Sequence, residues 1–394
     1  MTINFDLLQT VGVAALVFIL GQFIKSKVSF FQKYFIPAPV IGGLIASLLI
    51  FAFSKMGLVN IEFDATLQDF FMNLFFTCTG FTCSIAVLKK SGKLGAILAV
   101  GSVVFLIVQN IVGVSLASLF GINKLLGIAM GSVAMSGGVG SGASFGPTME
   151  SYGAVGATTI GVAAATFGLL LGSLVGGPVA NRLIKKYNLV SATAENIQEE
   201  EKNALFLDSK TLLQSTIAVL LAAFLGTYIG KILNLTGLNF PYYVGCLFGG
   251  AFIRNLADMG NSPIKLRMKE IDTIGSISLN LFLSMALMSL NISKLLDLAL
   301  PMIIILIAQA IAMMAWAYFV TFRTLGKDYE SAVMAAGHCG VGLGQTPNAI
   351  ANMSAVIESN GPAPTAWFVL PVVTVVFINL MNPIIITFFM NVFK

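Results

Sequence analysis

Apolar stretches of about twenty residues recur along the chain and are separated by short polar segments. A helix of that length crosses the ~30 Å hydrocarbon core of a bilayer. Ten stretches fit and predict transmembrane helices: 7–24, 36–53, 67–87, 94–120, 154–181, 211–233, 238–256, 272–290, 299–320 and 364–391. The pattern therefore predicts an all-α polytopic membrane protein.

Two further stretches, about 125–150 and 330–357, are too rich in Gly, Ser, Asn and Pro for lipid-facing helices. Backbone of that composition is tolerated at membrane depth only where protein or a cavity surrounds it. We therefore expect each stretch to form a re-entrant hairpin, and expect the two hairpins to meet near the middle of the membrane, as in secondary transporters.

The two halves of the chain resemble each other. Four pairs of segments match in the same order, at offsets of 200 to 207 residues: "IPAPVIGGL" (36–44) with "FPYYVGCLFGG" (240–250), "NLFF" (73–76) with "NLFL" (280–283), "SGGVGSGASFGPT" (136–148) with "HCGVGLGQTPNA" (338–349), and "GGPVAN" (176–181) with "MNPIII" (381–386). The order predicts two repeats, 1–186 and 211–394, each with five spans and one hairpin, joined by a charged linker at 187–210.

Five spans is an odd number, so the two repeats must enter the membrane from opposite sides. Composition agrees with a membrane protein, because only 10% of the residues are charged, against about a quarter in soluble proteins. With the N-terminus outside, 17 of the 22 lysines and arginines fall in inner loops, and the outer side keeps Lys55, Lys124, Lys231, Lys294 and Lys394. The positive-inside rule thus predicts both termini outside and the linker in the cytoplasm. The net charge of +5 reflects these loops and does not indicate nucleic-acid binding.

The hairpins carry the candidate substrate site. Glycine permits positive φ and close approach of the backbone to a ligand, free N–H groups at helix starts suit a carboxylate, and free carbonyls suit Na⁺. The alternative is that the glycines only allow close helix packing. The candidates are Ser136, Gly137, Gly138, Gly140 and Ser141 in the first hairpin, and His338, Cys339, Gly340, Gly342, Gly344, Gln345, Thr346 and Asn348 in the second.

His338 is the only histidine in the chain. An ionisable group at membrane depth is costly enough to suggest a function, so it could hold a substrate carboxylate, orient the hairpin or carry a proton. The alternative is a hydrogen-bonded interior residue. No acidic residue lies in the middle of a span, so the sequence favours Na⁺ over H⁺ as the coupling ion. Sodium ligands are expected on the third span of each half, although helix–helix hydrogen bonding is the alternative for each: Asn73, Thr77, Thr79, Asn280 and Ser284.

Several classes of protein are disfavoured. The chain has no G-x-x-x-x-G-K-[ST] motif for a nucleotide. "GASFG" (142–146) matches the nucleophile motif of hydrolases, but it lacks the strand and the buried acid that this motif needs. The four cysteines lack metal-ligand spacing, so we expect free thiols and no transition metal. We therefore expect a transporter that is not an enzyme and has no cofactor.

The motifs "SGGVGSG" and "AAGHCGVGLGQTPNAIANM", with five spans per half and a charged linker, resemble the bacterial sodium/glutamate symporters over nearly the whole chain. The resemblance implies Na⁺-coupled uptake of L-glutamate by an elevator motion, a homodimer and a bacterial inner-membrane location. It assigns the family's signature glycines to Gly137, Gly138 and Gly140, and to Gly340, Gly342 and Gly344. The chain departs at Val139, where the family often has histidine. A Na⁺ symporter for a di- or tricarboxylate such as malate or citrate, and a channel, are the alternatives.

Overall fold

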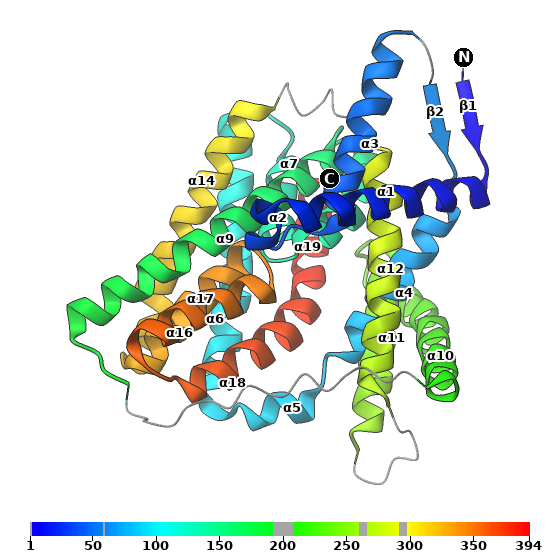
Figure 1. Cartoon of the computed structure of the whole chain (residues 1–394). Helices are drawn as coiled ribbons and strands as arrows, with labels where there is room; N and C mark the ends of the chain where they lie inside the picture. The colour runs from blue at the N-terminus through cyan, green and yellow to red at the C-terminus, as the bar shows by residue number, and fades with distance from the viewer. Residues whose placement is uncertain (1, 58–59, 192–207, 260–265, 291–297) are drawn as a thin grey trace.

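The computed structural model describes residues 2–57, 60–191, 208–259, 266–290 and 298–394, which are almost entirely helical (Figure 1). The helices are α1 (Leu7–Lys27), α2 (Ser29–Lys33), α3 (Ala38–Lys55), α4 (Thr66–Phe81), α5 (Ile85–Lys90), α6 (Gly92–Leu119), α7 (Lys124–Ile128), α8 (Gly138–Ser151), α9 (Ala157–Tyr187), α10 (Ser209–Asn234), α11 (Tyr242–Ala257), α12 (Met268–Met288), α14 (Ala299–Trp316), α15 (Phe322–Thr324), α16 (Tyr329–Leu343), α17 (Thr346–Asn360), α18 (Pro364–Val373) and α19 (Asn379–Phe393). Three π-helical turns join some of them: η1 (Ala129–Val133), η2 (Ala317–Thr321) and η3 (Thr374–Ile378).

All ten predicted spans coincide with helices. Within the described residues, nine helical segments are long and apolar enough to cross a membrane: α1, α3, α4 with α5, α6, α9, α10, α12, α14 with η2 and α15, and α18 with η3 and α19. The tenth predicted span is α11, which is shorter at 16 residues. Most of the predicted charged linker, residues 192–207, lies outside the described residues.

One element departs from the all-α prediction. Strand β1 (Thr2–Phe5) pairs in parallel with strand β2 (Asn60–Phe63), with Phe5 opposite Phe63. The rings of these two phenylalanines stack at a centroid distance of 5.5 Å. β1 leads into α1 and β2 leads into α4, so the short sheet ties the beginnings of two spans together. Four-residue strands give too little alternation for the sequence pattern to predict them.

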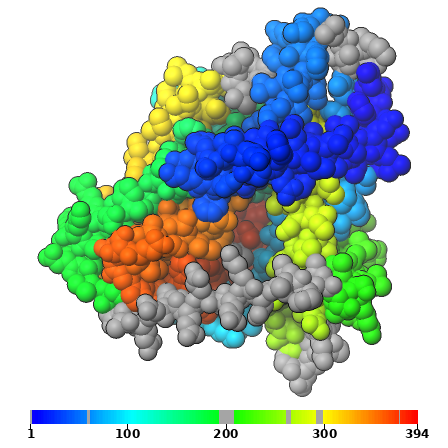
Figure 2. Space-filling view, in the orientation of Figure 1, coloured from blue at the N-terminus to red at the C-terminus, as the bar shows by residue number. Residues whose placement is uncertain are grey.

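The helices pack as two bodies. The scaffold body consists of α1, α3, α4, α10, α11 and α12, whereas the core body consists of α6 to α9 and α14 to α19. Figure 1 shows α4, α11 and α12 together at the right, and α9, α14, α16 and α17 at the left. In the space-filling view (Figure 2), the dark blue α1 crosses the front of the molecule above the orange α16 and α17. Each half of the chain contributes helices to both bodies.

The scaffold body has close backbone contacts where glycines meet. A Cβ on Gly80 of α4 would collide with the carbonyl of Leu247, and a Cβ on Gly250 of α11 would collide with the carbonyl of Thr77. The two glycines therefore let α4 and α11, one from each half, approach at backbone distance. Small residues allow this approach in membrane helices generally.

Several elements of the second half begin a little more than 200 residues after an element of the first half. α1 begins at Leu7 and α10 at Ser209, 202 residues later; α3 and α11 begin at Ala38 and Tyr242, 204 apart. Further along, α8 and α17 begin at Gly138 and Thr346, 208 apart. Pro178 inside α9 and Pro383 inside α19 also lie at matching places, 205 apart. These intervals are close to the offsets of the matching sequence segments.

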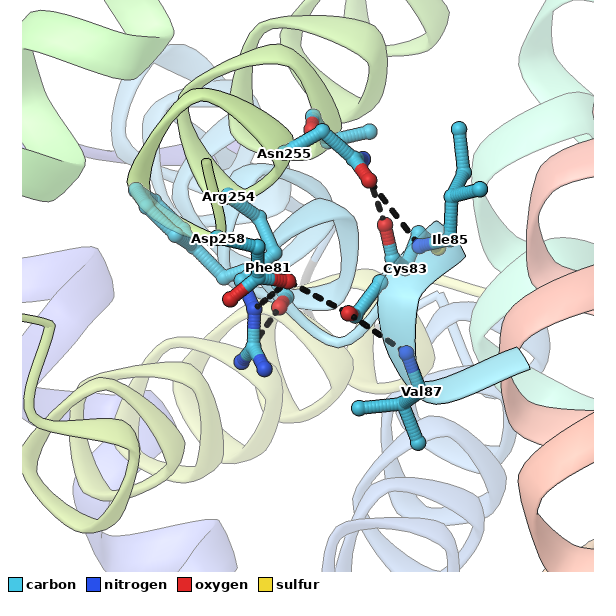
Figure 3. A network of polar contacts seen from close by, with 9 residues as sticks. Phe81, Cys83, Ile85, Val87, Arg254, Asn255 and Asp258 are labelled. Atoms are coloured by element: carbon cyan, nitrogen blue, oxygen red, sulfur yellow. Dashed lines mark hydrogen bonds and ion pairs between the residues drawn. The ribbon is translucent and has the colours of Figure 1, made fainter. Parts of the chain in front are cut away.

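A polar network fixes the junction between α4 and α5 to the end of α11 (Figure 3). The Asn255 side chain donates to the carbonyl of Cys83 at 2.8 Å and accepts from the N–H of Ile85 at 2.9 Å. The Ser84 hydroxyl donates to the carboxylate of Asp258, which also pairs with Arg254 at 2.9 Å. Since α5 leads into α6 of the core body, this network anchors the scaffold end of a connection between the bodies.

Candidate functional site

Each of the two Gly-rich stretches forms two helices with a break between them. In the first stretch, α7 and η1 precede a turn at Ser136 and Gly137, and α8 begins at Gly138 with a φ of +70°. Only glycine adopts that backbone conformation readily. The break follows from the backbone freedom of glycine.

The second break lies between α16 and α17. Gly344 ends α16, and Gln345 is extended, with φ −145° and ψ 173°. The N–H of Gln345 donates to Oδ1 of Asn348 at 3.2 Å, which caps the start of α17. Pro347 follows Thr346 in the first turn, where its missing N–H has no helical partner to lose.

The two breaks meet in the interior of the protein. A Cβ on Gly138 would lie 2.6 Å from Nε2 of Gln345, so the absence of a side chain at Gly138 admits the Gln345 amide. The start of α8 therefore lies against the residue that precedes α17. Each N-terminus carries a partial positive charge.

A cavity of about 90 Å³ lies at this meeting point, between the two bodies. The core body contributes polar groups, which include Ser136, Ser141, Gln345 and Asn382. The scaffold body contributes an apolar wall in which Phe75, Phe76, Leu247, Leu279 and Leu283 are prominent. Thr79 is the polar exception on that wall, but its hydroxyl donates to the carbonyl of Phe75 at 3.0 Å. A ligand in the cavity would therefore make its polar contacts to the core body.

One buried side chain supports both breaks. Gln109 of α6 accepts a hydrogen bond from the Ser136 hydroxyl at 2.7 Å and donates from Nε2 to the carbonyl of Gly342 at 2.6 Å. Gln309 of α14 donates to the backbone carbonyl of Gln109 at 2.8 Å. Neither glutamine is exposed. Our sequence analysis missed both, although an amide in the middle of an apolar span, at an offset of 200 residues, was a detectable signal.

Two buried amide oxygens in the core body lack a hydrogen-bond partner within the described chain, and the residue of one of them, Asn382, lines the cavity. Oδ1 of Asn382 and Oε1 of Gln309 are buried and accept no hydrogen bond from the described residues. The Asn382 amide donates to the carbonyl of Ser132 at 3.0 Å, which fixes the side chain. Pro383 has no N–H to donate to the carbonyl of Asn379, a second residue of the cavity wall. Such oxygens are suitable ligands for a hard cation.

His338 does not line this cavity. The His338 ring is 1% exposed, and its Nδ1 lies 2.9 Å from the Thr321 hydroxyl. Its Nε2 lies 3.3 Å from the Ser102 hydroxyl. Because a neutral imidazole offers one donor and one acceptor, the two hydroxyls satisfy it. This is the arrangement of the hydrogen-bonded interior residue that the sequence left as an alternative.

The other candidates of the second stretch have packing or capping contacts. Gly340 lies inside α16, where a Cβ would be 2.5 Å from the backbone of Ala349 in α17. Asn348 donates to the carbonyl of Leu169 at 2.9 Å and to the Ser173 hydroxyl at 2.6 Å. Four further candidates, absent from the cavity wall, lie in or next to these helices: Cys339, Gly342, Gly344 and Thr346.

The five predicted sodium ligands do not share one cavity. The Thr77 hydroxyl donates to the carbonyl of Asn73 at 2.8 Å, and the Asn280 amide donates to the carbonyl of Ser276 at 2.8 Å. Thr79 lines the central cavity, whereas Asn73 lines a separate hollow. The hydroxyl of Ser284 is buried, with no hydrogen-bond partner in the described part of the chain.

Metal-ligating side chains do not cluster in the described part of the chain. In residues 2–57, 60–191, 208–259, 266–290 and 298–394, no three His, Cys, Asp or Glu side chains come together. All four cysteines are buried free thiols: Cys78, Cys83, Cys246 and Cys339.

Comparison with known proteins identifies relatives over nearly the whole chain. Residues 3–362 match the family model described as "Sodium/glutamate symporter". The chain is 38% identical to the sodium/glutamate symporter of Escherichia coli K12, covering 98% of both chains. It is 34% identical to that of Haemophilus influenzae, covering 97% of this chain and 96% of the relative. A solved structure, the sodium proton antiporter MjNhaP1 of Methanocaldococcus jannaschii, is similar with a TM-score of 0.41 at 15% identity, covering 97% and 96% of the two chains.

Proposed function

This chain belongs to the sodium/glutamate symporter family, a family of secondary transporters, and we propose that it binds L-glutamate in the cavity where the two helix breaks meet. The main support is the contact between Gly138 and Gln345, because it brings the N-termini of α8 and α17 to one cavity. The cavity walls contain no lysine or arginine. Free N–H groups at the two helix starts would therefore bind the two carboxylates of the substrate.

Sodium would bind beside the substrate, on the core-body side. The unpartnered oxygens of Asn382 and Gln309 and the carbonyl of Asn379 are the proposed ligands, and Thr79 is the member of the predicted set that lines the same cavity. Na⁺ at this place would offset the charge of a bound carboxylate. Sodium and glutamate would then raise each other's affinity by the same factor, which is the thermodynamic basis of symport.

Transport would proceed by an elevator motion of the core body against the scaffold body. The cavity supports this motion because its polar groups lie mainly on the core body, whereas its scaffold wall is mainly apolar. The core body could therefore slide along the scaffold wall without breaking polar contacts between the substrate and the scaffold body. The connection through α5 is short and is anchored at Ser84 by the end of α11. The substrate would travel with the core body.

The two halves would be inverted repeats with both termini outside and the linker in the cytoplasm. The similar spacing of several elements in the two halves and the distribution of lysine and arginine support this proposal. Three hollows, of about 280 to 390 Å³, lie near the starts of α4 and α9 and the ends of α8 and α12. The proposed orientation places these helix ends on the outer side of the membrane. The arrangement described would thus be the outward-facing one. A homodimer in the bacterial inner membrane completes the proposal.

A di- or tricarboxylate such as malate or citrate is the second candidate substrate. It is favoured by one observation, which is that no carboxylate lines the central cavity to pair with the ammonium group of an amino acid. A competition experiment distinguishes the two substrates. If the site recognises an amino acid, excess unlabelled malate should leave the uptake of radiolabelled glutamate unchanged.

Uptake into proteoliposomes tests the proposal as a whole. A sodium gradient should drive accumulation of radiolabelled glutamate, and replacement of external Na⁺ by choline should abolish it. Equal accumulation in Na⁺ and choline would contradict the coupling. Electrical recording tests the channel alternative, since currents far above the coupled flux would contradict a transporter.

A further inference from the structure

A second hollow between the two bodies is lined by oxygen atoms that have no role in the central cavity. It has a volume of about 280 Å³ and is lined by α4 and α11 of the scaffold body and by α8 of the core body. It shares no lining residue with the central cavity. Asp69, Asn73, Ala143 and Tyr243 are the residues whose oxygen atoms matter here.

Two oxygens at this hollow lack partners. Tyr243 is 2% exposed, and its hydroxyl has no hydrogen-bond partner among the described residues. Its ring is held by Phe76, at a centroid distance of 4.6 Å, and by Phe145, at 5.1 Å. Oδ1 of Asn73 is likewise buried and without a partner. Because an unpaired buried polar atom is costly, two such atoms at one hollow indicate a missing ligand.

Two further oxygens complete a set of hard donors. Pro147 has no N–H, so the carbonyl of Ala143 lacks its usual helical donor. Asp69 lies one helical turn before Asn73, on the same side of α4. It is exposed at the hollow, and no lysine or arginine is among the residues that line it.

We propose that this hollow is a second sodium site, formed by the Asp69 carboxylate, Oδ1 of Asn73, the Ala143 carbonyl and the Tyr243 hydroxyl. A single carboxylate with neutral oxygens suits a monovalent cation, since divalent ions are usually held by more carboxylates. The site rests on the proposed Na⁺-coupled function but is distinct from the sodium position beside Asn382. Because both bodies supply ligands, a displacement of one body against the other would take the ligands apart.

Two conservative variants test the site. Asp69→Asn removes the charge with little change in shape, and Tyr243→Phe removes the hydroxyl while the ring keeps its contacts with Phe76 and Phe145. In proteoliposomes at saturating glutamate, the Na⁺ concentration for half-maximal uptake should rise about three- to tenfold in each variant, as expected for loss of one polar ligand. Glu62→Gln, an exposed acid on β2, and Tyr228→Phe, an exposed tyrosine on α10, are the matched controls.

A binding measurement without transport gives an independent readout. The Tm of detergent-purified protein should rise with NaCl, but not with KCl or choline chloride, and each variant should need a higher NaCl concentration for the same rise. Unchanged sodium dependence of both uptake and Tm in folded variants would overturn the site. A change in the half-saturating glutamate concentration alone would also overturn it, because the hollow would then hold substrate. If glutamate uptake by the wild-type protein does not depend on Na⁺, the result contradicts the proposed function and not the second site alone.

Discussion

The side-chain amide of Gln309 donates a hydrogen bond to the backbone carbonyl of Gln109, a residue 200 positions earlier in the chain. The bond joins α14 to α6, and the Gln109 side chain in turn joins α6 to both helix breaks. The two glutamines are therefore the buried support of the central cavity. Gln109 contacts a hydroxyl of one break and a carbonyl of the other, so it couples their positions.

Replacement of Gln109 by leucine tests this support. Gln109→Leu keeps the volume but removes the partners of Ser136 and of the Gly342 carbonyl. Each lost buried partner costs about 1–3 kcal/mol, so we expect the initial rate of glutamate uptake to fall at least tenfold at equal protein density. Ser118→Ala is the control on the same helix, because that exposed hydroxyl bonds only within α6. Uptake by Gln109→Leu equal to that of the control would refute the role.

Replacement of Gly138 by alanine tests the meeting of the breaks. The variant places a side chain at a φ of +70°, which costs about 1 kcal/mol, and against Nε2 of Gln345 at 2.6 Å. We expect the half-saturating glutamate concentration to rise about tenfold or more. The matched control is Gly101→Ala on α6, where a Cβ would meet no atom within 4 Å.

A double variant separates the two causes. In Gly138→Ala with Gln345→Ala, the collision is relieved but the backbone cost remains. If Gln345 makes no contact with the substrate, part of the lost uptake should return. No recovery at all would indicate that Gln345 itself binds substrate.

His338 offers a test of whether the histidine titrates during transport. In His338→Gln the amide can satisfy the hydroxyls of Thr321 and Ser102 in place of the ring. We expect uptake and its dependence on pH, between about pH 6 and 8, to match the wild type. His338→Leu should instead lower stability by about 1–3 kcal/mol, because it leaves both hydroxyls unpaired. A changed pH profile in His338→Gln would show that the imidazole carries a proton.

The network at Asp258 predicts a dependence of stability on pH. Burial, the largest single influence, raises the pKa of Asp258, but hydrogen bonds from Ser84 and Arg254 and the charges of Arg254 and Lys90 together lower the pKa below its usual value. A lowered pKa in the folded state means that the stabilisation is complete above the usual pKa and is lost as pH falls through the lowered value.

Thermal unfolding of Asp258→Asn measures this contribution. The variant should be less stable than the wild type by about 1 kcal/mol at neutral pH. The difference should shrink as pH falls below about 4, where the wild-type carboxylate also becomes protonated. Glu358→Gln, an exposed acid on α17, is the control. A difference that does not change with pH would rule out the charged form of Asp258 as its source.

The spans and the two helix breaks were predictable because they depend on local composition. Apolar length identified ten helical segments in the described chain, nine of which are long and apolar enough to cross a membrane, and the density of Gly and Ser identified both broken stretches. The division into two bodies was not predictable, since it depends on contacts such as that of Gly80 with Leu247, which join distant parts of the chain.

The match between "SGGVGSG" and "HCGVGLG" was a partial guide to the site. The first motif continues into α8 after its break, whereas the second lies in α16 before its break. The two similar motifs therefore occupy different positions relative to the helix breaks. Small residues in both motifs serve helix packing, as in the contact of Gly142 with Gly161. Gln109 was not predicted because a single amide hardly changes the apolar character of the stretch 94–120, so the apolar pattern does not mark it.

The anchored junction at Ser84 also sets a limit on how far the core body can be displaced at this point. Seven residues separate Ser84 from Gly92, where α6 begins. As a helix they span about 10 Å, and fully extended they reach about 25 Å. Beyond the first distance α5 must unwind, and the start of α6 cannot lie farther than the second distance from Ser84 while the end of α11 holds that residue. In the proposed elevator motion, the start of α6 would therefore stay within this reach of the scaffold body throughout the cycle.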